Sequence, residues 1–554
     1  MDTHAARSPV RYSGPLEQRQ PDEDATAAEL ARSMSDIRET TFRDYGHAVR
    51  PVHAKSHGLL TGELRVADGL PPELAQGLFA KAGTYPVVLR FSTNPGDVLD
   101  DDVSSPRGLA VKVIGVEGER LQGSEGDATQ DFVMVNAPAF AAPDPKAFAG
   151  NLKALAATTD TGQAWKKAFS AALRGAEAMV EALGGKSATL TTMGGHPATH
   201  PLGETFYTTT PFRHGDHVAK YAVAPVSPAL RALKDAPVEL SGHPNGLREA
   251  IIAFFRDGGG EWEIRAQLLT NPETMPIEDA SVEWPEEESP YVTVGRITAP
   301  PQPAWSEARA GVGDDGLSFS PWHGLAAHRP LGAVNRARQR AYREAASFRA
   351  ERNRCPIHEP RGAVALPDAP AETYGRAPGR EGRRPNTPDA RPGKVAAPMR
   401  EPVRHALAGA VGGLVGGLIL SGILAGTAAW SRSPSELALL ERRTAGRFGL
   451  DHRDEWEGPD AGEEVIGHAG HLALSVVAGA GYALVARDRA PAVPAGLAFG
   501  AGFYALCYGV LGPALGVTPT PGRETRGNLL VRGLNHLLFG VATAAVARGV
   551  ARRL

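Results

Sequence analysis

The chain is poor in cysteine and carries little net charge. Its 554 residues include two cysteines, Cys355 and Cys507, so a disulfide framework is excluded and a reducing compartment is favoured. The formal net charge of −3 argues against a general nucleic-acid-binding protein, which would carry a strongly basic surface. The first thirty residues contain no apolar run, and we therefore expect no secretory signal peptide.

The first 354 residues have the pattern of a polar arm followed by one α+β domain. Residues 1–28 are polar, and a helix is expected from Ala25 to near Tyr45. Helical patterns also occupy 146–184 and 245–257. Eight β-rich runs separated by Gly, Pro and Asp turns predict a mostly antiparallel barrel or sandwich within a domain spanning 29–354. The runs are TGELRV, PVVLRFS, LAVKVIG, DFVMVN, TFYTTTPFR, HVAKYAVAPV, EWEIRAQLL and YVTVGRI.

Residues 355–402 have a different composition. This segment holds ten prolines and many arginines but almost no aromatic residues. Such a composition cannot bury enough apolar surface to fold, because the ordering entropy would exceed the gain from burial. We predict a disordered, semi-stiff basic linker.

Residues 403–554 are predicted to form a bundle of about four membrane-spanning helices. The apolar segments 405–430, 465–486, 495–516 and 529–547 are each long enough to approach or cross a bilayer. Two pairs of glycines four residues apart, Gly412/Gly416 and Gly413/Gly417, give small faces for close helix packing in lipid. A buried bundle in a soluble protein is the alternative interpretation.

The distribution of basic residues predicts the orientation of the bundle. Four spans put both ends on one side, and that side carries the basic linker and the arginines that follow the second and fourth spans. The positive-inside rule therefore predicts a multi-pass protein of the inner membrane with the N-terminal domain in the cytoplasm. His468, His471 and His536 lie in these segments, and they could bind a metal, a haem or a quinone, or bond across helices.

The stretch 335–349, NRARQRAYREAASFR, has the composition of a helix and lacks Gly and Pro. Arg338 and Arg349 lie four residues before and seven residues after Tyr342, so all three side chains share one face. A guanidinium one turn before a phenol favours the phenolate. Taken alone, the helix could equally be a solvated amphipathic one whose tyrosine packs on the core.

Five segments upstream and within this helix resemble haem catalases, above all the shorter catalase-like haem proteins. They occur in one order across about 300 residues. They are HAVRPVHAKSHGLLTGELRV (47–66), RFSTN with SPRGLAVKV (90–94, 105–113), DFVMVNAPAF (131–140), NPETMPIEDASVEWPEEESPY (271–291) and LSFSPWHGLAAHRPLGAVNRARQRAY (317–342).

This resemblance implies a haem-b site and a role for each matching residue. Tyr342 becomes the axial iron ligand with Arg338 beside it, an uncommon ligand for which catalase is the known case. His53 becomes the distal acid and base, oriented by the Ser92 hydroxyl, and Asn136 the amide above the iron. The arginines that match those binding the haem propionates are Arg50, Arg90 and Arg349, and Phe148 is expected to pack on the porphyrin face.

The chemistry of peroxide cleavage agrees with these residue types. A peroxide must lose a proton from one oxygen and gain one on the departing oxygen, and one imidazole poised near neutrality can do both. Asn136 would supply a neutral donor. Two buried propionates need cationic partners, and arginine provides planar, bidentate ones.

The chain also departs from large catalases. The catalytic domain is shorter and stops soon after the proximal helix, and Ala346 stands where a histidine usually follows the tyrosine by four residues. These losses put in doubt a tetramer, a bound NADPH and a narrow substrate channel. The segments GHLALSVVAGAGYALVA and LGVTPTP resemble the YagU-like four-helix inner-membrane proteins, which implies no activity.

The leading hypothesis is a membrane-tethered, haem-dependent catalase or peroxidase that acts on hydrogen peroxide. It implies a small peroxide substrate and a lipid bilayer as partners, no nucleic acid, and allows a homo-oligomer. One alternative is a peroxidase or isomerase of organic or lipid hydroperoxides. An alternative of another class is a non-catalytic haem-binding sensor or a membrane transport subunit.

Overall fold

The computed structural model describes residues 8–149, 197–367, 401–431, 461–486, 491–511, 513 and 526–551. The chain divides into an N-terminal unit that contains a β-sheet and a C-terminal unit that contains the long apolar helices. Most of the helical pattern predicted at 146–184, and the predicted linker from residue 368 to 400, lie outside the described residues.

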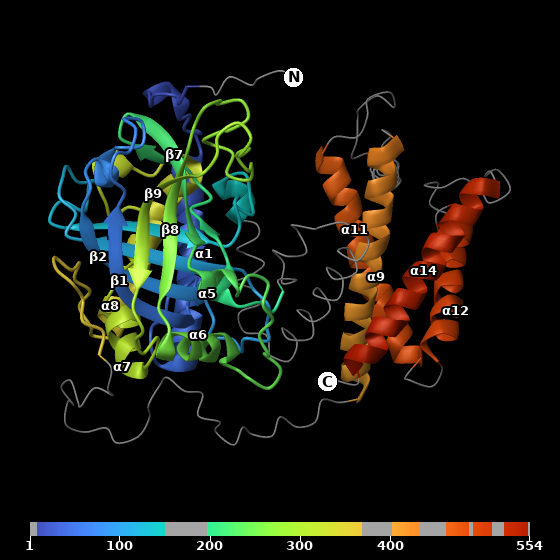
Figure 1. Ribbon diagram of the computed structural model, residues 1–554. Coiled ribbons are helices and arrows are strands. Elements are labelled where there is room, and N and C mark those ends of the chain that lie inside the picture. Colours follow the sequence, from blue (N-terminus) through green and yellow to red (C-terminus); the bar gives the residue numbers. More distant parts are fainter. Residues whose placement is uncertain are drawn as a thin grey trace. The chain divides into compact units, whose positions relative to one another are not determined.

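The N-terminal unit is built on one antiparallel barrel, as the spacing of the β-rich runs predicts (Figure 1). The sheet runs in the order β5-β4-β3-β2-β1-β9-β8-β7-β6, and a second pairing between β5 and β7 closes it into a ring. The strands are β1 (Ser56–Val66), β2 (Thr84–Thr93), β3 (Arg107–Ile114), β4 (Thr129–Val135), β5 (Phe206–Tyr207), β6 (Phe212–His214), β7 (His217–Pro225), β8 (Gly260–Leu268) and β9 (Val292–Ala299).

The two faces of the sheet carry different clusters of buried side chains. Successive side chains of a strand point to opposite faces of the sheet. Leu89, Phe91 and Phe132 belong to the large buried cluster that fills the barrel. Val88 and Ala110 belong to a different cluster, on the other face of β2 and β3. The residues of interest for function lie on this second face.

Two helices pack together beside that second face. Helix α1 (Glu23–Tyr45) and helix α8 (Ala333–Arg352) contact one another, and α8 contains the predicted helix 335–349. Met34 of α1 and Ala341 of α8 share a small apolar cluster. The other described helices of this unit are α5 (Pro228–Arg231), α6 (Gly246–Asp257) and α7 (Glu307–Ala310). Helix α6 agrees with the helical pattern predicted at 245–257.

Apolar residues from both ends of this unit, the predicted polar arm and the predicted linker, pack against buried clusters. In the predicted polar arm, Val10, Tyr12 and Leu16 contact a buried cluster that includes Trp284. In the segment predicted as linker, residues 355–367 are described, and Leu366 is buried beside Leu59 of β1. The folded unit therefore extends past residue 354, because a few apolar anchors suffice to hold an otherwise polar segment.

The C-terminal unit consists of the helices α9 (Glu401–Ser431), α11 (Ala461–Ala486), α12 (Ala492–Tyr504) and α14 (Arg526–Ala551), with a π-helical turn at Ala505–Leu511 after α12. Three stretches, Arg404–Leu424, Ala492–Val510 and Leu529–Ala551, are long and apolar enough to cross a membrane. The predicted second span falls in α11, whose described apolar part is Leu474–Ala486. The end of the third predicted span lies outside the described residues.

The glycines of α9 allow the close helix packing predicted from their spacing. A Cβ added to Gly413 would lie 2.0 Å from the Ser475 carbonyl oxygen of α11, and one added to Gly412 would lie 2.3 Å from the Thr543 carbonyl oxygen of α14. Larger side chains would force both neighbours away. His471 Nδ1 lies 3.1 Å from Ser421 Oγ of α9, which is the cross-helix bond weighed above as the alternative to a ligand role.

Candidate active site

Two adjoining cavities lie between helix α8 and the second face of the sheet. His53 and Tyr342 line both cavities. The walls that the two share are otherwise apolar: Met34, Val52, Val133 and Ala341. The structure thus brings together the histidine and the tyrosine that the sequence predicts on opposite sides of a cofactor.

His53 is held by its backbone and by Ser92. Its backbone N–H donates to the Asn94 carbonyl at 2.8 Å, and its Nδ1 lies 3.1 Å from Ser92 Oγ. With φ at 54°, His53 adopts a left-handed conformation that is uncommon outside glycine. Such strain is stored where the surroundings require one orientation, often at functional sites.

The space around His53 depends on a glycine. A Cβ added to Gly108 of β3 would lie 2.5 Å from His53 Cε1, so any other residue would displace the imidazole. Ser92 Oγ lies 3.5 Å from the Gly108 carbonyl oxygen and 3.1 Å from His53 Nδ1. When the hydroxyl donates to the carbonyl and accepts from Nδ1–H, His53 Nε2 carries no proton and can act as a base.

Burial and nearby positive charge keep the imidazole of His53 neutral. Burial, followed by the charges of Arg90, Arg338 and Arg50, lowers the pKa of His53 to about 3. The imidazole is therefore neutral at physiological pH. Arg90 and Arg338 lie far from His53 in the sequence, so their effect on its pKa arises only in the fold.

Tyr342 and Arg338 form the predicted pair on helix α8. Arg338 Nη2 donates to Tyr342 Oη at 3.0 Å, and the guanidinium carbon lies 5.2 Å from the centre of the tyrosine ring. Their four-residue spacing places them on adjacent turns, as expected for a helix. The hydrogen bond directs positive charge at the phenol oxygen.

The three predicted propionate-binding arginines converge on Asp314, which the sequence analysis missed. Arg90 Nε donates to Asp314 Oδ1 at 2.7 Å, and Arg50 Nη1 donates to the same oxygen at 3.2 Å. Arg349 donates to the Asp314 backbone carbonyl. Ser56 Oγ donates to Asp314 Oδ2 at 2.6 Å. The only sequence signal was a glycine-flanked Asp-Asp pair, which is equally common in a surface turn.

This cluster carries more positive than negative charge. Its three guanidiniums face the carboxylates of Asp314 and Asp315, and burial, together with Arg349 and Arg90, lowers the pKa of Arg50 well below its usual value. Burial also lowers the pKa of Arg349 to about 10. Arg349 Nε is buried and has no hydrogen-bond partner among the described residues. A planar apolar cofactor with two carboxylates at one edge, such as haem b, fits this set of residues.

Asn136 and Phe148 occupy different surroundings. Phe148 lines the larger cavity and contacts Phe140, with ring centres 4.9 Å apart. Asn136 is not among the residues that line either cavity; its Nδ2 donates to Glu204 Oε2 at 2.6 Å and its Oδ1 accepts from the Arg107 N–H at 2.9 Å. Asn94 lines the larger cavity instead. The role that the resemblance implies for Asn136 stays a prediction.

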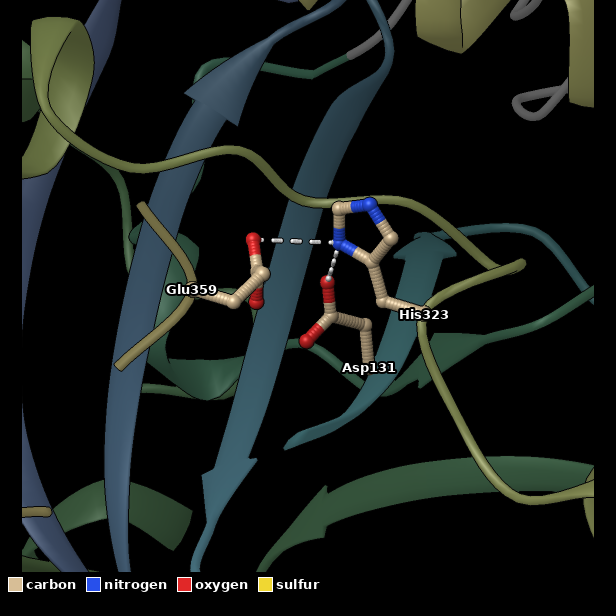
Figure 2. A group of neighbouring side chains, drawn as sticks. All are labelled: Asp131, His323 and Glu359. Atoms are coloured by element: carbon tan, nitrogen blue, oxygen red, sulfur yellow. Dashed lines mark ion pairs between the residues drawn. The ribbon is translucent and has the colours of Figure 1, made fainter. Parts of the chain in front are cut away.

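A second cluster of metal-binding residue types lies on the same face of the sheet. Figure 2 shows Asp131 and Glu359 directed at one ring nitrogen of His323, at 3.3 and 3.2 Å. Lys112 Nζ already lies 2.8 Å from Asp131 and also contacts Glu359. Burial alone would lower the pKa of His323, but the hydrogen bonds and charges of Asp131 and Glu359 raise it to about 9. Two cations thus occupy this site, and we interpret it as an ion-pair network that fastens residues 355–367 to the barrel.

Of the comparisons with known proteins, only the one with solved structures found matches. No protein-family model matches the chain, and no curated protein matches it. These searches therefore lend no support to a relation between residues 403–554 and the YagU-like proteins.

The solved structures similar to this chain include catalases. A fungal catalase is 17% identical with a TM-score of 0.42, over 68% of this chain and 74% of its own. A bacterial catalase is 17% identical with a TM-score of 0.41, over 70% and 72%. Catalase A from Saccharomyces cerevisiae is 15% identical with a TM-score of 0.41, over 74% and 90%.

Proposed function

We propose that the barrel unit binds haem b between Tyr342 and His53 and decomposes hydrogen peroxide as a catalase or peroxidase. One observation carries this proposal. His53 and Tyr342 line both adjoining cavities; Ser92 and the three arginines Arg50, Arg90 and Arg349 line the first, and Arg338 lines the second. A binding protein without activity would need no strained, oriented base beside the cofactor.

Each part of the cavity has a role in holding the cofactor. Tyr342 Oη would bind the iron, and Arg338 would stabilise negative charge on that oxygen. Arg50, Arg90 and Arg349 would bind the two propionates, with Asp314 fixing the guanidiniums. When bound, haem supplies the electron-transfer chemistry that no amino-acid side chain provides.

His53 moves the proton. The neutral Nε2 accepts a proton from one peroxide oxygen, and the resulting imidazolium, unstable in this buried site, returns it to the departing oxygen as water leaves. Two peroxide molecules then give two waters and one dioxygen in a catalase, whereas a peroxidase takes two electrons from a separate donor. Ser92 keeps the imidazole in the orientation that this transfer requires.

We further propose that the C-terminal helices anchor this enzyme in the inner membrane, with the barrel on the cytoplasmic side. Three stretches long and apolar enough to span a bilayer support the anchoring. The excess of arginine next to them supports the orientation. A homo-oligomer is compatible with this arrangement.

Organic or lipid hydroperoxides are the second candidate substrates. The larger cavity is lined mainly by apolar side chains, including Leu30, Phe140 and Phe148, which would tolerate an apolar chain. An anchored enzyme would also meet lipid hydroperoxides at the bilayer surface.

Oxygen evolution from hydrogen peroxide by the detergent-purified, haem-loaded full chain tests the proposal. Rapid evolution would establish a catalase. Turnover only with an added reductant, or with a fatty-acid hydroperoxide, would establish the peroxidase or isomerase. Bound haem with neither activity would favour the sensor or transport subunit and contradict the proposed enzyme.

A further inference from the structure

The proximal pair Tyr342–Arg338 is connected to a third, deeply buried residue. Asn335 lies in the first turn of α8 and is completely buried. Its Oδ1 accepts from Arg338 Nη1 at 3.2 Å and lies 3.1 Å from Thr210 Oγ1, whose single proton is shared between this oxygen and the Thr208 carbonyl at 3.2 Å. The bonds therefore run from Asn335 through Arg338 to the Tyr342 oxygen.

The orientation of the Asn335 amide is determined by its other contacts. Its Nδ2 donates to the carbonyl oxygens of Leu331 and Pro211, both at 3.0 Å. Carbonyls accept only, so the amide nitrogen must face them and the amide oxygen must face Arg338. Both amide protons and the bond from Arg338 have fixed partners, which holds the side chain in one position.

The charge of Arg338 is not neutralised by a neighbouring acid. In the part of the chain that the structure describes, no carboxylate forms an ion pair with Arg338, whereas Arg336 on the same helix contacts Glu17, Glu23 and Glu278. The charge of Arg338 also contributes to lowering the pKa of His53, so it acts across the cavity. A neutral partner is needed to hold the guanidinium without reducing that charge.

We propose that Asn335 is a positioning residue that holds Arg338 against Tyr342 and, being uncharged, leaves the full guanidinium charge for the phenol oxygen. This inference rests on the proposed role of Tyr342 as iron ligand. An acid at position 335 would pair with Arg338 and withdraw its charge from the phenol. The oxygen of Tyr342 would then donate more negative charge to the iron and favour its oxidised form.

The test measures the haem iron rather than turnover. In the haem-loaded, detergent-purified full chain, Asn335→Asp is expected to shift the midpoint potential to a more negative value and to move the visible tyrosinate-to-iron band. Gln339→Glu, which adds the same charge to the same helix one turn further on, is expected to leave both near wild type. Equal shifts in the two variants, or no shift in Asn335→Asp, would overturn the proposal.

A double-mutant cycle covers the case in which Asn335→Asp fails to fold. Asn335→Ser keeps a small polar group but loses the reach to Arg338, and Arg338→Gln removes the charge. If Asn335 acts through Arg338, the double variant has the same potential as Arg338→Gln alone, whereas additive shifts would contradict the inference. Tyr342→Phe separates the two proposals: if that variant leaves the haem spectrum unchanged, the proposed ligand is wrong, independently of Asn335.

Discussion

His53 combines strain, burial and surrounding positive charge in one residue. Its φ of 54° and the close approach of Gly108 fix the ring, while Ser92 holds Nδ1. Burial and the arginines keep the imidazole neutral. A base of this kind takes a proton only when a reacting group presents one, and releases it readily.

Removing this imidazole should slow peroxide cleavage without releasing the cofactor. His53→Ala is expected to keep haem but to lower the rate by roughly 10²–10⁴-fold, the usual contribution of a positioned acid or base. His243→Ala, at an exposed histidine, is the matched control. Stopped-flow measurement with hydrogen peroxide checks this, and a near-normal rate in His53→Ala would mean that another group moves the proton.

The two asparagines near the site can be separated by substitution. Because Asn94 lines the cavity and Asn136 is bonded to Arg107 and Glu204, we expect Asn94→Ala to raise the KM for peroxide by several-fold or more. Asn136→Ala is expected to act mainly on stability, since Glu204 Oε2 loses its Asn136 donor and the Arg107 N–H loses its acceptor. Steady-state kinetics with thermal unfolding tests this; a selective kinetic defect in Asn136→Ala would restore the role implied by the resemblance.

Residue identities were easier to predict than their partners. Sequence motifs singled out Arg50, Arg90 and Arg349, and the structure brings them together. Asp314 and Asn335 could not be predicted, because an acid in a glycine-rich turn and an asparagine at a helix start have many ordinary roles. Asp314 meets Arg50 and Arg90, and Asn335 meets Thr210 and Pro211, across more than one hundred residues of sequence, and no local pattern encodes these contacts.

At the scale of elements, sequence patterns predicted the strands and helix α8 well, whereas composition predicted the segment 355–367 less well. Alternating runs identified the barrel strands, and the absence of Gly and Pro identified α8, because both signals are local. The segment 355–367 was assigned to a linker because proline and arginine dominate its composition. Leu366 and Glu359 nevertheless hold this segment on the barrel. Two such residues among many polar ones hardly change the average composition of the segment.

Glu359 should be the main polar anchor of this segment. Glu359 lies beside Lys112 and His323. Burial alone would raise the pKa of Glu359, but these two cations lower it to about 2. Glu359→Gln is expected to cost about 1.5–3 kcal/mol, the usual contribution of a hydrogen bond to a charged group. Hydrogen–deuterium exchange should then increase in residues 355–367. Glu351→Gln, at an exposed glutamate, is the control, and equal exchange in both variants would contradict this account.

At the scale of the whole molecule, the barrel should be sensitive to acid. Burial lowers the pKa of His200 and His214 to about 4, and burial, followed by the charge of His214, lowers the pKa of His328 to about 3. Each of these histidines binds its proton more readily in the unfolded state, so the stability of the fold falls as the pH drops below about 6.5. His323 has the opposite effect: its raised pKa stabilises the fold below about 6.5, and this contribution is lost as the pH rises towards 9.

We therefore expect the unfolding temperature of the barrel to fall between about pH 7 and pH 5. Between pH 7 and pH 5, each buried neutral histidine lowers the free energy of unfolding by on the order of 1–2 kcal/mol. His200, His214 and His328 together outweigh the opposite contribution of His323. Thermal unfolding of the full chain in detergent, followed by near-ultraviolet circular dichroism at constant ionic strength, measures this. A barrel that is equally stable or more stable at pH 5 would contradict it.

The absorption spectrum of the haem-loaded full chain, compared with that of Tyr342→Phe, tests the central claim most directly. We predict that the wild-type protein retains haem through purification with a tyrosinate-type spectrum, and that Tyr342→Phe is haem-poor or spectrally altered. Tyr85→Phe, on strand β2, should be unchanged. A wild-type protein that binds no haem, or a Tyr342→Phe spectrum identical to wild type, would contradict the account.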